Sequence, residues 1–229
     1  EYSGGLVGAI ESATITQSFS SSTVISNSYA GGLVGAIYKA EISNSFSLGP
    51  INAANQTGGL IGLVIQGQDL ELPPESWLPN AASTISNSYA VGEVVGEYYV
   101  GGLIGESNDL AEITHSYWAT DTTTQLNSDG EDEFTGYIGT TLDELKCPTS
   151  ANNTSCVLNT NMYEGWDSDI WHFGNESELP GLIIGDLIYR NEAPISIEDW
   201  DIENQQFESI TPISNAPAIE NTNNEAKST

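Results

Sequence analysis

Apolar and polar positions recur along the first half of the chain in short strings. The first string is Gly-Gly-Leu, then Val or Ile, then Gly, and it starts four times at spacings of 27, 27 and 43 residues. Its recurring members are Gly4, Gly5, Leu6 and Gly8; Gly31, Gly32, Leu33 and Gly35; Gly58, Gly59, Leu60 and Gly62; and Gly101, Gly102, Leu103 and Gly105. Four copies in this order indicate a repeated structural unit.

A second string, Ile-x-x-Ser-aromatic, alternates with the first. It occupies residues 15–19, 25–29, 42–46, 85–89 and 113–117. Its third position is Asn27, Asn44 or Asn87 in three copies, with Gln17 and His115 in the same slot of the other two. If copies stack, we expect the Asn side chains to form a hydrogen-bonded ladder.

The repeats predict short strands rather than helices. Paired glycines disfavour a helix by about 1 kcal/mol each, whereas the Ile, Val, Thr, Tyr and Phe around them favour strands. Side chains alternate along a strand, so one side receives Leu6 with Ile10, Leu33 with Ile37, and Leu60 with Val64. One unit cannot bury its own face but stacked neighbours can, so we predict an all-β, parallel β-solenoid over 1–117. We expect glycine to supply its left-handed corners and its close backbone contacts.

The spacing of 43 residues has a visible cause. The segment at about 64–84 contains three prolines, Trp77 and several acids. Proline lacks the N–H that a sheet interior requires, so we predict an inserted loop. Insertions in repeat proteins emerge on one face, which is often the face that binds.

Charge excludes several classes of partner. The 229 residues include 4 Lys and Arg against 32 Asp and Glu, a formal net charge of −28. Such a chain cannot neutralise a nucleic-acid backbone, and an anionic membrane surface repels it. No run reaches the roughly 18 apolar residues of a membrane-spanning helix. The partners that remain are a surface ligand of unknown identity or copies of the chain itself.

The two strings together resemble the GLUG-motif repeats of bacterial secreted and surface proteins. The match runs from residue 4 to about 117 and continues through SYWATDTTTQ (116–125), LDELKCPTS (142–150), GWDSDIWHFG (165–174) and LPGLIIGDLIY (179–189). The resemblance implies an extracellular or cell-surface location and a non-catalytic role in adhesion or as a rigid spacer. Two alternatives stay open, a self-assembling subunit of an extracellular fibre and an accessory segment of a large secreted hydrolase. The chain opens inside a motif, so we expect a fragment or a processed form.

The acidic second half is expected to close the solenoid. Residues 1–105 contain only 8 acids, whereas residues 106–229 contain 24, together with Trp118, Trp166, Trp171 and Trp200. The open end of a solenoid exposes unpaired backbone groups. We therefore predict that 118–190 forms a Trp-rich, acidic C-terminal cap. The Asn-, Ser-, Thr- and Pro-rich remainder, 191–229, is expected to be a linker or tail.

Two cysteines lie nine positions apart in the expected cap. Cys147 and Cys156 lack the C-x-x-C spacing of a redox site and a second pair for zinc. We predict a disulfide that closes a small polar loop, as suits an exported protein. The two histidines, His115 and His172, are expected to be structural.

Acidic residues offer candidates for metal binding and catalysis. One polar loop gathers Asp121, Asp129, Glu131, Asp132 and Glu133, and carboxylate oxygens are the ligands that Ca²⁺ takes. The loop matches no known calcium motif, so we predict no cofactor and keep calcium as the open alternative. Asp167 and Asp169 form an acid pair of the kind that glycosidases use, but a hydrogen-bonded turn explains them better. No HExxH or GxSxG string is present, and we predict a protein without enzymatic activity.

Overall fold

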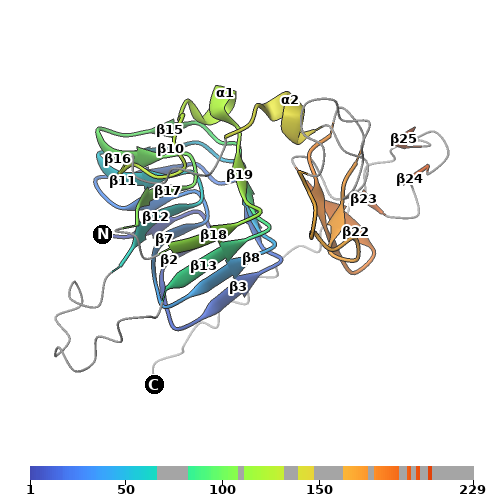
Figure 1. Ribbon diagram of the computed structural model, residues 1–229, viewed down its shortest axis with the longest axis horizontal. Helices are drawn as coiled ribbons and strands as arrows, with labels where there is room; N and C mark the ends of the chain where they lie inside the picture. Colours follow the sequence, from blue (N-terminus) through green and yellow to red (C-terminus); the bar gives the residue numbers. More distant parts are fainter. Residues whose placement is uncertain are drawn as a thin grey trace, which may run out of the picture.

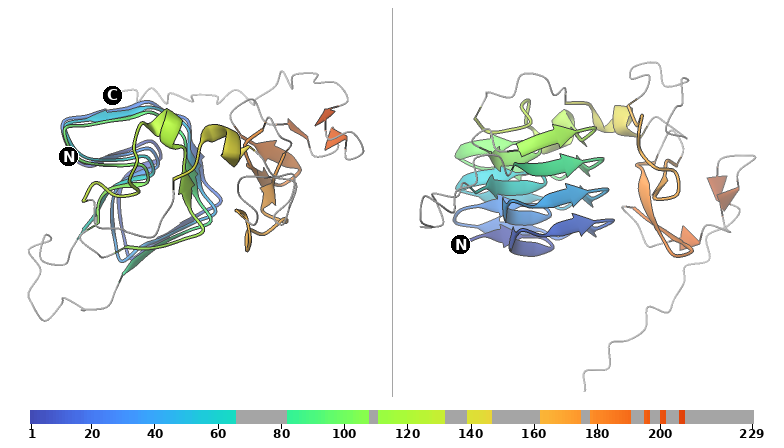
Figure 2. Two further views of the ribbon diagram at one scale, coloured as in Figure 1. Left: turned by 45° about the horizontal axis from the view of Figure 1, so that its top comes forward. Right: turned by 60° about the horizontal axis from the view of Figure 1, so that its bottom comes forward.

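The first half of the chain winds into a stack of coils. The computed structural model describes residues 1–65, 82–107, 111–131, 139–146, 162–174 and 178–190, and also places short strands at 195–196, 200–201 and 206–207. Four successive coils lie on one another, and their equivalent strands pair in parallel (Figure 1). Figure 2 shows these coils as layers that begin at the N-terminus. The prediction of an all-β solenoid is confirmed.

Five parallel sheets run along the stack; each of the four coils supplies one strand to sheets A to D, and the first three coils supply one each to sheet E. Sheet A contains β1 (Ser3–Gly4), β6 (Ala30–Gly31), β11 (Asn55–Gly58) and β16 (Tyr98–Gly101). Sheet B contains β2 (Val7–Glu11), β7 (Val34–Tyr38), β12 (Ile61–Val64) and β17 (Ile104–Glu106). Sheet C contains β3 (Thr14–Thr16), β8 (Glu41–Ser43), β13 (Ser83–Ser86) and β18 (Ala111–Thr114). Sheet D contains β4 (Phe19–Ser20), β9 (Phe46–Ser47), β14 (Tyr89–Ala90) and β19 (Tyr117–Trp118). Sheet E contains β5 (Val24–Ser26), β10 (Ile51–Ala53) and β15 (Val94–Val95).

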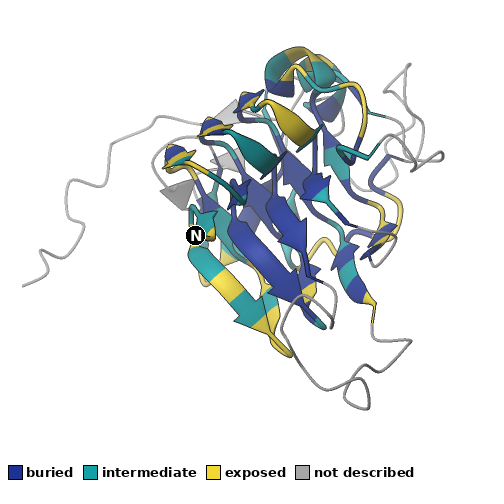
Figure 3. Cartoon of the chain, turned by 90° about the vertical axis from the view of Figure 1, so that its left-hand side faces the viewer, coloured by how far each residue is buried: buried dark blue, intermediate teal, exposed yellow. Residues whose placement is uncertain are grey.

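Similar side chains lie above one another inside the coils. Sheet C aligns Ile15, Ile42, Ile85 and Ile113 in one column. Leu33, Ile37, Leu60 and Val64 share one buried cluster, as the alternation of side chains predicts. Leu6, at the same repeat position in the first coil, is 49% exposed because that coil has a neighbour on one side only. Figure 3 shows the same contrast between the strand nearest the N-terminus and the dark blue strands beside it.

The repeat glycines are required for space rather than for backbone conformation. In all four strings, a Cβ on any of the three glycines would overlap a neighbouring atom. Gly58, for example, faces the carbonyl oxygen of Ile61, and Gly62 lies against the carbonyl oxygen of Gly35 in the adjacent coil. None of these glycines has a positive φ. The expectation of close contacts is confirmed, and the expectation of left-handed glycine corners is wrong.

Other residues supply the left-handed corners. The third position of the second string has φ of 46° at Gln17, 47° at Asn44, 48° at Asn87 and 45° at His115. Asn and His adopt this conformation more readily than most residues, which explains their place there. The predicted Asn ladder does not form as expected, because Asn27 is not in this column. Its string begins in β5, where Ile25 pairs with Asn52 and is 78% exposed.

The strand register accounts for the inserted segment. Ile37 and Glu41 are four residues apart, whereas their partners Val64 and Thr84 in the next coil are twenty apart. The difference of 16 residues equals the increase in repeat spacing from 27 to 43. The expected boundaries at about 64–84 shift slightly inward, since Val64 ends β12 and Ser83 begins β13. Residues 66–81 lie outside the described residues.

The end of the stack after the fourth coil is covered. Gly102 N–H donates to Asn127 O at 2.8 Å, Leu103 N–H donates to Ser128 O at 2.9 Å, and Ile104 forms a bridge with Asp129. The indole of Trp118 lies against Gly102 and donates to Gln125 O. Two short helices follow, α1 (Thr120–Thr123) and α2 (Leu142–Leu145). In the part of the chain that the structure describes, no helix is long and apolar enough to cross a bilayer.

The later tryptophans lie elsewhere than expected. Residues 162–174 and 178–190, here called the flanking module, carry the antiparallel strands β20 (Trp171–His172), β21 (Gly181–Ile184) and β22 (Leu187–Tyr189), which β23 (Ile195–Ser196) extends. The module packs against the side of the stack at sheet D rather than over its end (Figure 2). Strands β24 (Trp200–Asp201) and β25 (Gln206–Phe207) form a separate pair. The rest of the expected tail lies outside the described residues.

Candidate functional site

A shallow groove lies at the corner between sheets B and C. It has a volume of about 310 Å³, and three coils line it: coil 1 with residues 12–14, coil 2 with 39–41, and coil 3 with Ala82 and Thr84. Ser12 and Lys39 occupy equivalent left-handed corners, with φ of 50° and 49°. The Nζ of Lys39 lies 4.7 Å from the centre of the Tyr38 ring. The groove adjoins the point where the inserted segment re-enters the stack, and we call it the corner groove.

The flanking module meets the stack through aromatic rings. The last residue of the second string forms an outward column on sheet D, in which Phe46 stacks on Phe19 at 5.0 Å and on Tyr89 at 4.9 Å between ring centres. Trp171 packs against this column, 6.1 Å from Phe46 and 6.0 Å from Tyr89. Its indole N–H also donates to Asn44 Oδ1 at 3.1 Å. The aromatic position of the repeat is therefore the docking surface of the module.

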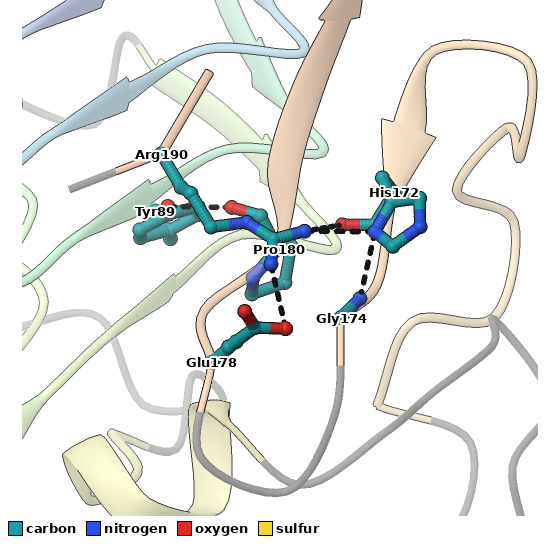
Figure 4. A network of polar contacts seen from close by, with 6 residues as sticks. All are labelled: Tyr89, His172, Gly174, Glu178, Pro180 and Arg190. Atoms are coloured by element: carbon teal, nitrogen blue, oxygen red, sulfur yellow. Dashed lines mark hydrogen bonds and ion pairs between the residues drawn. The ribbon is translucent and has the colours of Figure 1, made fainter. Parts of the chain in front are cut away.

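A buried ion pair lies behind this interface (Figure 4). Arg190 Nη1 is 2.7 Å from Glu178 Oε2, and Arg190 Nη2 is 2.7 Å from His172 Nδ1. Because arginine only donates, Nδ1 is the acceptor and the His172 proton lies on Nε2. Nearby, the Tyr89 hydroxyl donates to Pro180 O at 2.8 Å, which links the stack to the module. The network connects the module's sheet to sheet D.

Burial, together with the charge of Arg190, lowers the pKa of His172 to about 4. In the unfolded chain the imidazole titrates near 6.5. The unfolded state therefore binds more protons between these values, and the stability that neutral His172 contributes is lost as the pH falls from about 6.5 to 4. His172 contacts Arg190 and Gly174 inside the module, and its structural role stays a prediction.

In the structure, Asp121 of the expected calcium loop has a different contact from Asp129, whereas Glu131 stays beside Asp129. Asp121 Oδ1 accepts from Leu142 N at 2.8 Å, at the start of α2. Asp129 lies over the fourth coil, where its Oδ1 accepts from Glu131 N at 2.7 Å. Asp132 and Glu133 lie outside the described residues. Within the described ranges, no three acids, histidines or cysteines gather in a way that could hold a metal ion.

The carboxylate form of Asp129 is disfavoured in the folded chain. Burial raises its pKa to about 6; the nearby Ser107 side chain and the Glu131 N–H oppose this increase, and the Glu131 and Glu106 carboxylates add to it. The unfolded value is near 3.9. The folded state therefore holds this proton more tightly, so the contribution of Asp129 to stability is full below about pH 4 and is lost as the pH rises through 6.

Asp129→Asn is expected to stabilise the protein at pH 7 by about 1–2 kcal/mol, because the amide keeps the acceptor for Glu131 N and carries no charge. At pH 4 the variant and the native chain are expected to unfold alike. Urea unfolding at both pH values measures the difference, with Asp143→Asn as a control at a side chain that is 94% exposed. If the variant is less stable than the native chain at pH 7, the conclusion that folding disfavours the Asp129 carboxylate is contradicted.

The remaining predicted residues have local roles where they are described. Asp167 Oδ1 accepts from Asp169 N at 2.8 Å, so the acid pair stabilises a turn. His115 lies in the left-handed column, and its carbonyl oxygen accepts from the Trp166 indole at 3.0 Å. Cys147 and Cys156 lie outside the described residues, so the disulfide stays a prediction.

Sequence reasoning missed the ion pair of Arg190 with Glu178 and the corner groove. One signal for the first was available, because Arg190 is among only 4 basic residues and directly follows the apolar segment that ends at Tyr189. A comparison of the chain with family models, with curated proteins and with solved structures gives no match. The resemblance to GLUG repeats therefore stays an expectation from the motifs.

Proposed function

We propose that this chain is a non-catalytic repeat module of an exported bacterial protein, acting at the cell surface or outside the cell in adhesion or as a rigid spacer. The observation that supports this proposal is the in-register stack of four coils. Its interior is filled by buried apolar columns, so outward residues can vary without altering the fold. Location and adhesion rest on the resemblance to GLUG repeats.

The register of coil 3 defines a deletion that would remove the inserted segment. In coil 2 Tyr38 is followed directly by Lys39. The equivalent residues of coil 3 are Ile65, which corresponds to Tyr38, and Ala82, which corresponds to Lys39. Deleting 66–81 would join those two residues directly. Ala82 would then take the left-handed corner of Lys39, so Ala82→Gly should accompany the deletion.

The deletion variant is expected to fold, with a free energy of unfolding within about 1 kcal/mol of the native value, because shortening the connection between two strands changes closure entropy only slightly. Circular dichroism and urea unfolding test this expectation. Loss of the β signal in the variant would show that the register through coil 3 is wrong.

The same variant separates the two roles in the proposal. Beads coated with native or deleted chain are incubated with bacterial and animal cells, and bound beads are counted. Binding by the native chain alone supports adhesion through the inserted segment. Absence of binding by both folded chains supports the spacer role. Turnover of a polymeric substrate by the purified native chain would contradict the proposal and favour the alternative of a hydrolase segment.

Self-assembly into a fibre is favoured by one observation. The first coil exposes Leu6 at 49%, whereas the equivalent Leu33 and Leu60 of the inner coils are fully buried. The opposite end is covered by 127–130, however, so head-to-tail stacking would have to displace this cover. Light scattering at high concentration and electron microscopy test the alternative, and a strictly monomeric mass would exclude it.

A further inference from the structure

The corner groove presents hydrogen-bonding groups of every kind. Its lining residues include Ser12, Thr14, Thr84, Lys39 and Glu41, whose side chains end in hydroxyl, ammonium and carboxylate groups. A hydroxyl both donates and accepts, an ammonium only donates, and a carboxylate only accepts. Pockets for apolar molecules are lined mainly by hydrophobic and aromatic side chains. The chemistry of this groove instead suits a molecule that carries many hydroxyl groups.

The hollow itself results from short side chains. Ala13, Ala40 and Ala82 contribute to its lining, one from each of three successive coils. Adjacent strands of a sheet lie about 4.8 Å apart, so the groove extends along the stack. An elongated, open groove fits a segment of a linear polymer better than a compact molecule.

Charge limits the class of polymer. Lys39 and Glu41 carry opposite charges on the same coil, so the lining has no net charge. The whole chain has a formal charge of −28, and its field repels anionic polymers. An uncharged ligand avoids that repulsion and can use both charged groups as hydrogen-bond partners.

We propose that the corner groove binds a hexose unit of an uncharged polysaccharide. The inference rests on the proposed adhesive function and gives the chemical class of the surface ligand. Lys39 donates to sugar hydroxyls, Glu41 accepts from them, and the three hydroxyl side chains complete the contacts. The alanines leave the space that the sugar ring occupies.

The test is a titration of the ¹⁵N-labelled chain with uncharged hexasaccharides (glucan, mannan and galactan) and with an anionic galacturonan of equal length. At least one uncharged oligosaccharide is expected to shift the amide signals of Ser12, Lys39, Glu41 and Thr84, and the galacturonan is not. Lys39→Met and Glu41→Gln are each expected to weaken binding about tenfold, since a hydrogen bond to a charged group is lost. Ala13→Leu, which fills the hollow, is expected to abolish binding.

Glu112→Gln is the matched control, because Glu112 follows Thr84 in the same column of sheet C and does not line the groove. It is expected to bind within twofold of the native chain. Unchanged amide signals away from the groove establish that each variant is folded. The inference is overturned if no uncharged oligosaccharide shifts the groove amides, if the groove variants bind as well as the control, or if the galacturonan binds more tightly.

Failure of this inference is distinguishable from failure of the adhesive role. Beads that carry Lys39→Met or Ala13→Leu and still adhere as the native beads do would leave adhesion in place and exclude the groove as its site. Loss of adhesion in these variants, with Glu112→Gln unaffected, supports both.

Discussion

Gly58→Ala is expected to destabilise the solenoid by at least about 3 kcal/mol and to abolish its two-state unfolding, since overpacking at a backbone contact cannot relax. The added methyl group would overlap the carbonyl oxygen of Ile61 and the backbone around Gly105 in the next coil. Both obstacles are backbone atoms, held in place by the hydrogen bonds of sheet B. The coils would have to separate to make room, which breaks the register above and below.

Gly165→Ala is the control for this prediction. Gly165 has φ of 86°, and no neighbouring atom lies within 4 Å of the position that an added methyl group would take. Its substitution therefore costs only the backbone strain, about 1 kcal/mol. Urea unfolding followed by far-ultraviolet circular dichroism compares the two variants. Equal stabilities would show that the repeat glycines serve conformation rather than close packing.

Trp171→Ala is expected to detach the flanking module from the stack and to cost about 3–5 kcal/mol. Trp171 is fully buried, packs on Phe46 and Tyr89, and donates to Asn44. Removing the indole leaves a cavity at the aromatic column and an amide oxygen without its donor.

Limited proteolysis and near-ultraviolet circular dichroism report this detachment. The variant is expected to be cleaved within the module while the coils stay protected, because the stack has its own buried core. Ile184→Ala serves as the control, since Ile184 lies on β21 of the same module and is 42% exposed. Cleavage of the coils at the same rate as the module would show that the two fold as one unit.

The solenoid was predictable because segments that recur at the repeat spacing pair with one another in the same sheet. Ile15 and Ile42 are 27 residues apart, like the glycine strings, and they pair in sheet C. Ile25 begins a string with the same letters, yet it is only 17 residues from Ile42 and lies in sheet E. Spacing, rather than local sequence, decides which sheet a segment joins.

The position of the later tryptophans was harder to predict. Trp166 and Trp171 require burial, but they could be buried equally well against the open end of the solenoid or against the outward aromatic column of sheet D. The column of Phe46 and Tyr89 was visible in the repeat as its last position. What the sequence lacks is a signal that this position points outward, since that depends on how the chain turns at Asn44 and Asn87.

The corner groove could not be predicted, because it forms where several short side chains from different coils leave space beside one another. Ala13 and Ala40 are ordinary small residues between predicted strands. Only the register brings them beside Ala82, across the inserted segment, and leaves a hollow there.

The central claim is that equivalent residues of successive coils lie side by side, and a pair of cysteines tests it directly. In a background with Cys147→Ser and Cys156→Ser, Glu41→Cys with Thr84→Cys places two thiols on paired residues of β8 and β13, 43 positions apart in the sequence. Neighbouring strands lie about 4.8 Å apart, within the Cα separation that a disulfide spans. Mild oxidation is expected to join them, with a mass loss of about 2 Da from the two thiol hydrogens and a cross-linked peptide. The offset pair Glu41→Cys with Ser86→Cys should stay reduced. Cross-linking of the offset pair, or of neither, would contradict the in-register stack.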